Sequence, residues 1–392
     1  MRQAITPENQ RWLGDQLRVW RAEGWIDEEV ADRIGGSYEV VSGRRLNLAR
    51  LLLSLGGVFV GVGVIWLVAA NLEELSPMVR LAAVFALFVA ALIGAEALAD
   101  RREHRGTIPS PVVHALRLVT CLLLGAVIYQ AAQSLQVPAY EPALLGLWSI
   151  GCLLYAHLMR TATPLLVGLP VGFAWALWAP MVEHGSWLTF VVAMFAAALL
   201  ATSVAQLPQP APSFTAWWRE TGAASALAGL FAAAIPAAEP DGFGIGLSLA
   251  LVLAGAGVAL ALALWRGRDR REPAVVALLG AFAVLLVIWE AGQDVENVDL
   301  ASWAHAALAV SIYVGAALGV AYLGIVHDSL RLTLIATAAL VVFTTFQAFA
   351  VFGQIIQGAW LFLLLGLVLA GSGYAFDRVR REIAASVEGD AR

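Results

Sequence analysis

The chain contains no lysine, so all 24 of its basic residues are arginines. This absence excludes a phosphate-binding loop lysine, a Schiff-base lysine and a lysine general base. Only two cysteines are present, Cys121 and Cys152, and both lie in apolar stretches, so we expect neither a disulfide framework nor a cysteine-based metal site. Charged residues are also scarce, at 14% of the chain against about 25% in an ordinary globular protein.

Apolar residues make up 60% of the 392 residues, against about 45–50% in a globular chain. They fall in uninterrupted runs of about 20 residues, the length that an α-helix needs to cross a bilayer. This pattern excludes a soluble, fibrous or disordered chain. It predicts an all-α protein whose main part is a polytopic transmembrane helical bundle.

Twelve candidate spans follow one another, at residues 51–70, 81–99, 112–137, 142–159, 161–182, 185–207, 221–238, 242–265, 273–289, 300–326, 332–352 and 355–376. The fifth contains Pro164, Pro170 and Pro180, which makes it the best candidate for a broken or kinked helix. The seventh is short and rich in alanine, so the pattern also allows ten or eleven spans.

The placement of arginine favours twelve spans with both termini in the cytoplasm. Cytoplasmic loops of membrane proteins retain Arg and Lys, and translocated loops do not. With twelve spans, almost every arginine outside a span, including the cluster at 266–271, falls on the cytoplasmic side, and the opposite loops are acidic. We therefore expect a multi-pass protein of a bacterial cytoplasmic membrane, with domains at 1–47, 48–376 and a cytoplasmic tail at 377–392.

The polar segment at 1–47 has the pattern of a small helical hairpin. Thr6, Pro7 and Glu8 are typical of a helix start, and Gly24 ends that helix. Asp27 then caps a second helix that we expect to run to Tyr38. Such a hairpin is too small to bury a core of its own. We expect it to dock on a cytoplasmic protein, on a second copy of the chain or on the membrane surface.

Three stretches carry a family resemblance: WRAEGWIDEEVADRI, LLLSLGGVFVGVGVIWLVAANLEELSPMVRL, and GAVIYQAAQSL followed by LLGLWSIGCLLYAHLMRT. Together they resemble the predicted bacterial membrane proteins grouped as domain of unknown function twenty-one fifty-seven. The resemblance covers roughly residues 9 to 165. It implies a membrane location and a cytoplasmic hairpin, and it implies no activity. After Gln133 the sequence SLQVPAY departs from the family pattern.

Glu96, His114 and Arg117 form the first candidate site. Ionisable groups cost about 2.5–3.5 kcal/mol at the centre of a membrane helix, so each needs a partner or a purpose. Glu96 lies near the cytoplasmic end of the second expected span, and His114 and Arg117 lie near that end of the third. They are interpreted either as a structural ion pair, with side chains that reach the headgroups, or as a proton-linked gate.

The second candidate site lies at the opposite end of the third expected span. Tyr129, Gln133 and Gln136 follow helical spacing, and Gln130 and Glu141 lie close to them in the sequence. Such amides and hydroxyls either bind a polar ligand in a cavity or join neighbouring helices by hydrogen bonds.

Small-residue steps occur at Gly168 and Gly172 and at Gly315 and Gly319, where we expect helices to approach closely.

Catalytic signatures such as HExxH and GxSxG are missing, and we expect no enzyme, no cofactor, no metal and no nucleic-acid partner. Two hypotheses about function remain. One is transport-like movement of a small solute or lipid through a polar cavity between helices. The other is a membrane scaffold or sensor whose hairpin binds a cytoplasmic partner.

Overall fold

The computed structural model describes residues 3–5, 7–40, 76–105, 110–235, 242–290 and 300–352, and the single positions 56, 59, 63, 366 and 371. The first and twelfth expected spans and the expected tail at 377–392 lie outside these ranges, apart from those single positions.

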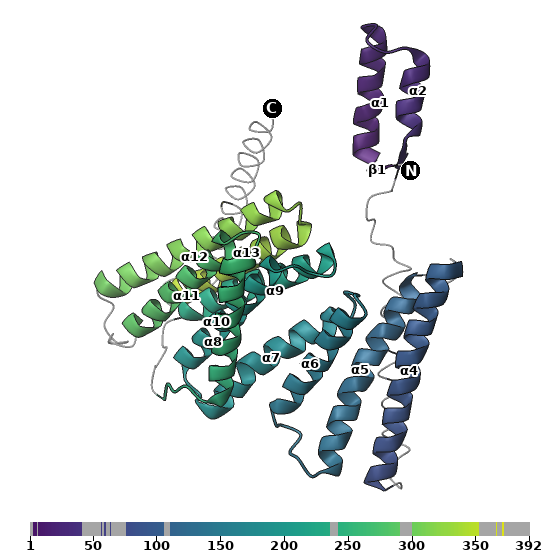
Figure 1. Ribbon diagram of the computed structural model, residues 1–392. Helices are drawn as coiled ribbons and strands as arrows, with labels where there is room; N and C mark the ends of the chain where they lie inside the picture. The colour runs from purple at the N-terminus through teal and green to yellow at the C-terminus, as the bar shows by residue number, and fades with distance from the viewer. Residues whose placement is uncertain are drawn as a thin grey trace.

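Ten long helices follow one another in the described part of the chain (Figure 1). They are α4 (Pro77–Arg105), α5 (Ser110–Ser134), α6 (Ala143–Leu158), α7 (Leu165–Glu183), α8 (Trp187–Gln206), α9 (Pro212–Ala233), α10 (Leu247–Arg266), α11 (Arg271–Glu290), α12 (Leu300–Val326) and α13 (Leu330–Phe352). Eight of them are long and apolar enough to cross a membrane. The shorter α6 and the charge-bearing α9 are the other two, and the total of twelve spans stays a prediction.

Helix α9 corrects the expected seventh span. The span was expected to begin at Thr221, but the helix begins at Pro212, which stands at its first turn. Proline suits this position because the first helical N–H groups need no acceptor inside the helix. Arg219 and Glu220, which hydropathy had assigned to a loop, therefore lie inside a helix.

Helix α7 is continuous from Leu165 to Glu183 although Pro170 and Pro180 lie inside it. Pro164 stands at its N-cap, where the missing N–H costs nothing. The three prolines therefore do not split this helix into two.

The N-terminal segment forms the expected hairpin of α1 (Pro7–Ala22) and α2 (Glu28–Gly36). Gly24 has a φ of +75°, which a glycine adopts without strain. The Asp27 carboxylate accepts the Val30 N–H at 2.7 Å and so caps α2. In Figure 1 the hairpin lies apart from the long helices.

Two short strands at the base of the hairpin were not expected. β1 (Gln3–Ile5) pairs in parallel with β2 (Tyr38–Val40), with Gln3 opposite Tyr38. Tyr38 was expected in the second helix, and that prediction is wrong. The helix ends at Gly36 because glycine is among the residues least favourable to a helix interior.

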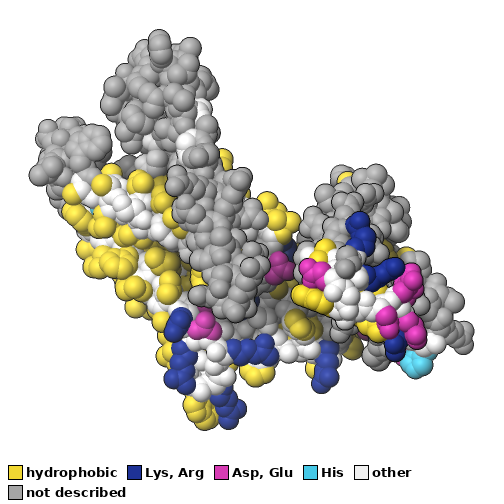
Figure 2. Space-filling view, turned by 90° about the horizontal axis from the view of Figure 1, so that it is seen from above, with side chains coloured by type: hydrophobic (Ala, Val, Ile, Leu, Met, Phe, Trp, Pro, Cys, Tyr) yellow, Lys and Arg dark blue, Asp and Glu magenta, His cyan; other side chains and the backbone are white. Residues whose placement is uncertain are grey.

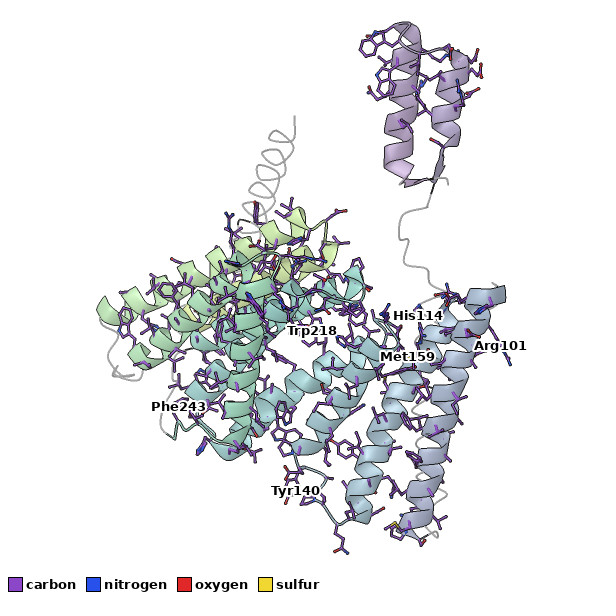
Figure 3. All side chains as sticks on the ribbon, viewed as in Figure 1. Arg101, His114, Tyr140, Met159, Trp218 and Phe243 are labelled. Atoms are coloured by element: carbon purple, nitrogen blue, oxygen red, sulfur yellow. The ribbon has the colours of Figure 1, made fainter. Side chains whose placement is uncertain are left out.

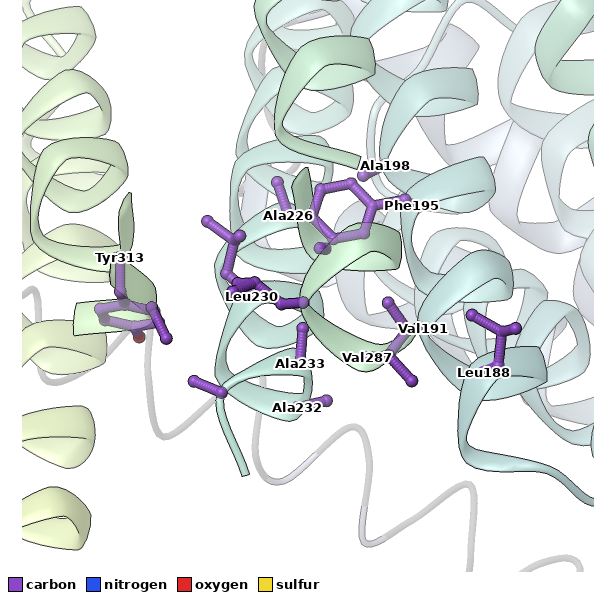
Figure 4. Close-up of a cluster of buried hydrophobic side chains, with 14 of the residues drawn as sticks. Leu188, Val191, Phe195, Ala198, Ala226, Leu230, Ala232, Ala233, Val287 and Tyr313 are labelled. Carbon is purple, nitrogen blue, oxygen red and sulfur yellow. The ribbon is translucent and has the colours of Figure 1, made fainter. Parts of the chain in front are cut away.

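Helix α8 lies at the centre of the bundle and α4 at its edge. In an 18-residue apolar window, 72% of α8 is buried, against 11% of α4. Small residues such as Ala193, Ala198 and Ala201 let neighbouring helices pack closely on α8. Figure 4 shows the core cluster, to which α8, α9, α11 and α12 contribute the labelled residues Leu188, Val191, Phe195, Ala198, Ala226, Leu230, Ala232, Ala233, Val287 and Tyr313.

The expected close approach holds at one glycine pair and not at the other. A Cβ on Gly168 would lie 3.1 Å from the Cβ of Cys152, so α6 and α7 touch there. A Cβ on Gly315 or Gly319 would meet no described atom within 4 Å, so that prediction is wrong. Helix α12 packs through other residues instead, among them Tyr313 and Ala317.

Candidate functional site

Glu96 on α4 and Arg117 on α5 form a bidentate ion pair. Nε of Arg117 donates to Oε1 of Glu96 at 2.9 Å, and a terminal guanidinium nitrogen donates to Oε2 at 2.8 Å. The side chains are only 25% and 13% exposed. This fork geometry is the strongest arrangement that arginine and a carboxylate can make.

The same ion pair also binds α6 and the loop after it. The Tyr155 hydroxyl donates to Oε1 of Glu96 at 2.6 Å, and Arg117 donates to the Thr161 hydroxyl at 3.0 Å. We call Glu96, Arg117, Tyr155 and Thr161 the Glu96 network. The Glu96 carboxylate joins α4, α5 and α6, and Arg117 extends the network to the α6–α7 loop.

His114, predicted to lie with Glu96 and Arg117, lies one helical turn before Arg117. Its Nδ1 is 2.7 Å from the Thr163 hydroxyl oxygen, so it holds the same α6–α7 loop from a second point. Figure 3 shows His114, Met159 and Arg101 toward one end of the helices and Tyr140 toward the other. The Glu96 network therefore lies at the end that we predict to be cytoplasmic.

The second candidate site does not form one helix face. Helix α5 ends at Ser134, and Gln136 follows it with a φ of +58°. The Val137 N–H donates to the Ala132 carbonyl at 2.8 Å, a bond that closes a helix C-terminus and precedes Pro138. Gln136 therefore leaves the face that carries Tyr129 and Gln133, and the predicted spacing is wrong at that residue.

The members of this second site also differ in burial. Tyr129 and Gln130 are half-buried, and Gln133, Gln136 and Glu141 are exposed. None of them lines the cavity described below.

A second buried carboxylate, which hydropathy did not predict, lies at Glu272 in the first turn of α11. It is 6% exposed, and three side chains from other elements bind it. Arg219 of α9 donates to Oε2 at 3.0 Å, the Gln206 amide of α8 donates to Oε2 at 2.6 Å, and His327 has its Nε2 3.0 Å from Oε1. We call these four residues the Glu272 network.

Glu220, next to Arg219 on α9, forms a related pair with the start of α13. Its carboxylate is 3.1 Å from Arg331 and accepts a bond from the Ser329 hydroxyl at 3.2 Å. The Arg331 guanidinium also lies 4.6 Å from the ring centroid of Trp217. Two consecutive residues of α9 therefore bind α11 and α13.

A local signal for these networks is present in the sequence. Ala211 and Pro212 form a helix start, and a helix from there places Arg219 and Glu220 within a membrane helix, where each needs a partner. Glu272 had no such signal, because it follows Arg270 and Arg271 in a sequence typical of a solvated loop.

A cavity of about 220 Å³ lies between α6, α7, α8, α9 and α10. Its walls are mainly aliphatic and aromatic, with Trp175 and Trp218 among them, and Ser149 and Thr221 carry the hydroxyl groups. The Ser149 hydroxyl already donates to the Gly168 carbonyl at 2.8 Å. The cavity is thus predominantly apolar, in contrast to the polar cavity expected from the sequence.

Two residues of the cavity wall are exposed on the surface of the bundle, and we place the opening of the cavity there. Ile150 on α6 is 55% exposed and Leu251 on α10 is 54% exposed. Within the described ranges, no three His, Cys, Asp or Glu side chains come together as metal ligands would.

These observations define an integral membrane protein with several apolar helices. Residues 18–166 match the family model described as "Predicted membrane protein (DUF2157)", which confirms the resemblance seen in the sequence motifs. No curated protein and no solved structure matches the chain.

Proposed function

We propose that this membrane protein takes a lipid chain into the cavity between α6 and α10 and moves it between the bilayer and the bundle. The single observation that carries the proposal is the cavity itself, with its apolar walls and its opening at Ile150 and Leu251. The proposal involves no enzymatic step.

The chemistry of the walls favours a lipid over a small polar solute. A polar solute leaves water only where several hydrogen-bonding groups replace its hydration, and most of this wall offers none. The volume of about 220 Å³ exceeds that of an engineered 150 Å³ cavity that binds benzene, and it is below the 300–1,000 Å³ of typical drug-sized pockets. One acyl chain segment fits this range better than a whole lipid.

The two buried ion-pair networks hold together helices that surround this cavity. Between lipid-embedded helices the hydrophobic effect supplies little attraction, so packing and polar bonds hold the bundle together. Glu96 joins α4, α5 and α6, and Glu272 joins α8, α9 and α11. Three of the helices that form the cavity wall, α6, α8 and α9, are thereby bound to neighbouring helices.

A reconstituted lipid assay tests the proposal. Full-length protein is placed in phosphatidylcholine vesicles that contain a phosphatidylcholine with a spin label on its acyl chain, and the spectrum reports the fraction of labelled chains whose motion the protein restricts. We expect the protein to produce a restricted fraction and Leu251→Trp, which narrows the opening, to reduce it. Leu264→Trp is the matched control, because Leu264 is exposed on the same helix and does not line the cavity. Equal restricted fractions in both variants would contradict the proposal.

The proposed location is a bacterial cytoplasmic membrane with the Arg266–Arg271 loop in the cytoplasm. The distribution of arginine supports this orientation. Cys121 and Cys152 are both buried, so a single new thiol at Arg268→Cys gives a clean reporter. A membrane-impermeant maleimide should label this variant only after the cells are opened. Labelling of intact cells would show that the loop lies outside the cytoplasm and would contradict the proposed orientation.

The second candidate function is a scaffold or sensor that binds a cytoplasmic partner, or a second copy of the chain, through the hairpin. Its specific support is Trp25, which is 71% exposed in the turn between α1 and α2, and Val19, which is 47% exposed on α1. Cross-linked co-purification of wild type and Trp25→Ala tests it. Unchanged cross-linked species in Trp25→Ala would remove this candidate.

A further inference from the structure

The loop between α10 and α11 has an asymmetric distribution of charge. Its sequence Arg266–Glu272 contains four arginines and two acidic residues. The fold turns Glu272 inward, where Arg219, Gln206 and His327 bind it. Four exposed arginines remain on the outside, Arg266, Arg268, Arg270 and Arg271.

The other acidic side chain of the loop, Asp269, forms a hydrogen bond at the start of α11. Its carboxylate accepts the backbone N–H of Arg271 at 2.8 Å. Asp269 is itself exposed, so the outer surface of the loop carries four arginines against one carboxylate, and it is more basic than the sequence composition alone indicates.

The end of α8 fixes the backbone of this loop. The N–H of Arg268 donates to the Gln206 carbonyl at 3.2 Å, and the N–H of Asp269 donates to the Gln206 side-chain oxygen at 3.2 Å. Because both N–H groups bind Gln206, the backbone that carries the arginine side chains is held in one position.

An exposed tryptophan lies beside the arginines. Trp265 is 68% exposed, and the Arg266 guanidinium lies 4.3 Å from its ring centroid. Tryptophan at the end of a membrane helix is typical of the headgroup level, so these arginines lie at the depth of lipid phosphates. Figure 2 shows arginine side chains gathered along one edge of the molecule next to apolar side chains.

We propose that the α10–α11 loop is a binding surface for anionic phospholipid headgroups, with Arg268 and Arg270 as its main phosphate contacts and Trp265 with Arg266 at its rim. Arginine matches phosphate because its planar fork donates two parallel hydrogen bonds. This surface is separate from the apolar cavity, and the inference does not depend on the proposed lipid movement.

Lipid titration of the purified full-length protein in a neutral detergent tests the surface. The apparent Kd for phosphatidylglycerol is read from its effect on the unfolding temperature, for wild type and for the double variant Arg268→Gln/Arg270→Gln. Each arginine near an anionic surface contributes about 1 kcal/mol, which is about fivefold in affinity. We therefore expect the double variant to weaken the apparent Kd by on the order of tenfold or more.

Arg101→Gln/Arg102→Gln is the matched control, because these two arginines are exposed on α4, outside the loop. We expect it to weaken the apparent Kd less than the loop variant does, because the exposed carboxylates of Asp100 and Glu103 flank these two arginines and lower the net charge there. Equal weakening in both double variants would overturn the proposal, because it would show a diffuse charge effect. Equal stabilisation by phosphatidylcholine, or by inorganic phosphate alone, would also overturn it, because neither requires an anionic lipid headgroup.

Discussion

Tyr155 and Arg117 bind the same oxygen atom of Glu96, the hydroxyl from 2.6 Å and Nε from 2.9 Å. The two donors come from α6 and α5, and the acceptor comes from α4. A single carboxylate oxygen therefore joins three helices that have little hydrophobic reason to associate inside a bilayer. The Glu96 network is the part of the candidate site for which the sharpest stability predictions follow.

Tyr155→Phe should destabilise the folded protein by about 1.5–3 kcal/mol, the usual contribution of a hydrogen bond to a charged group. The ring stays in place, so the change isolates the hydroxyl. Unfolding in mixed micelles measures the free energy. Tyr140→Phe, at a residue that is 72% exposed, should have almost no effect. Equal stability of Tyr155→Phe and wild type would show that the bond to Glu96 contributes nothing.

Arg117→Gln should cost about 3–5 kcal/mol, because it leaves the Glu96 charge largely buried without its partner. Removing both charges in Glu96→Gln/Arg117→Gln should recover part of this loss. The same unfolding measurement applies, with Arg101→Gln on the exposed surface of α4 as the control. If the double variant loses as much unfolding free energy as Arg117→Gln alone, or more, this explanation is contradicted.

Glu272→Ala should also cost about 3–5 kcal/mol, because Arg219 then remains largely buried without its carboxylate. The loss should loosen the contacts of α11 with α8 and α9, which hydrogen exchange of those helices reports. Glu103→Ala, an exposed acid on α4, is the control. Unchanged exchange in α8 and α9 would mean that the Glu272 network does not hold these helices together.

Gly125→Ala should destabilise by about 1–3 kcal/mol through overpacking. A Cβ there would lie 2.5 Å from the Trp148 ring, and that ring is held by its N–H bond to the Cys121 carbonyl at 2.8 Å. Gly315→Ala is the matched control, because no described atom lies within 4 Å of its Cβ. It should be neutral or stabilise by up to about 1 kcal/mol through helix propensity. A melting temperature of Gly125→Ala that equals or exceeds that of Gly315→Ala would contradict this account.

Much of the fold was predictable because its signals are local. Apolar runs of membrane-spanning length gave the positions of α5, α6, α8, α11, α12 and α13 to within about three residues at each end. The cap at Asp27 and the turn at Gly24 gave the hairpin. At α9, where Arg219 and Glu220 lie inside the helix, hydropathy alone placed the helix start at Thr221, although the helix begins at Pro212.

The candidate site was less predictable, because its members come from distant parts of the chain. Glu96 and Arg117 shared a predicted depth on adjacent helices, which made them a plausible pair. Glu272 and His327 are separated by two helices, and no local pattern links them. The expected face of Tyr129, Gln133 and Gln136 failed at the last residue because α5 ends before it.

The sequence by itself determined that this is a membrane protein of many apolar helices, since composition and run length depend on no neighbour. It also placed the hairpin and the arginine-rich loop along the chain. Only the tertiary structure decided that Glu272 faces inward and the arginines around it face outward, because burial of a charge depends on partners contributed by other helices. The apolar cavity likewise exists only where five helices meet.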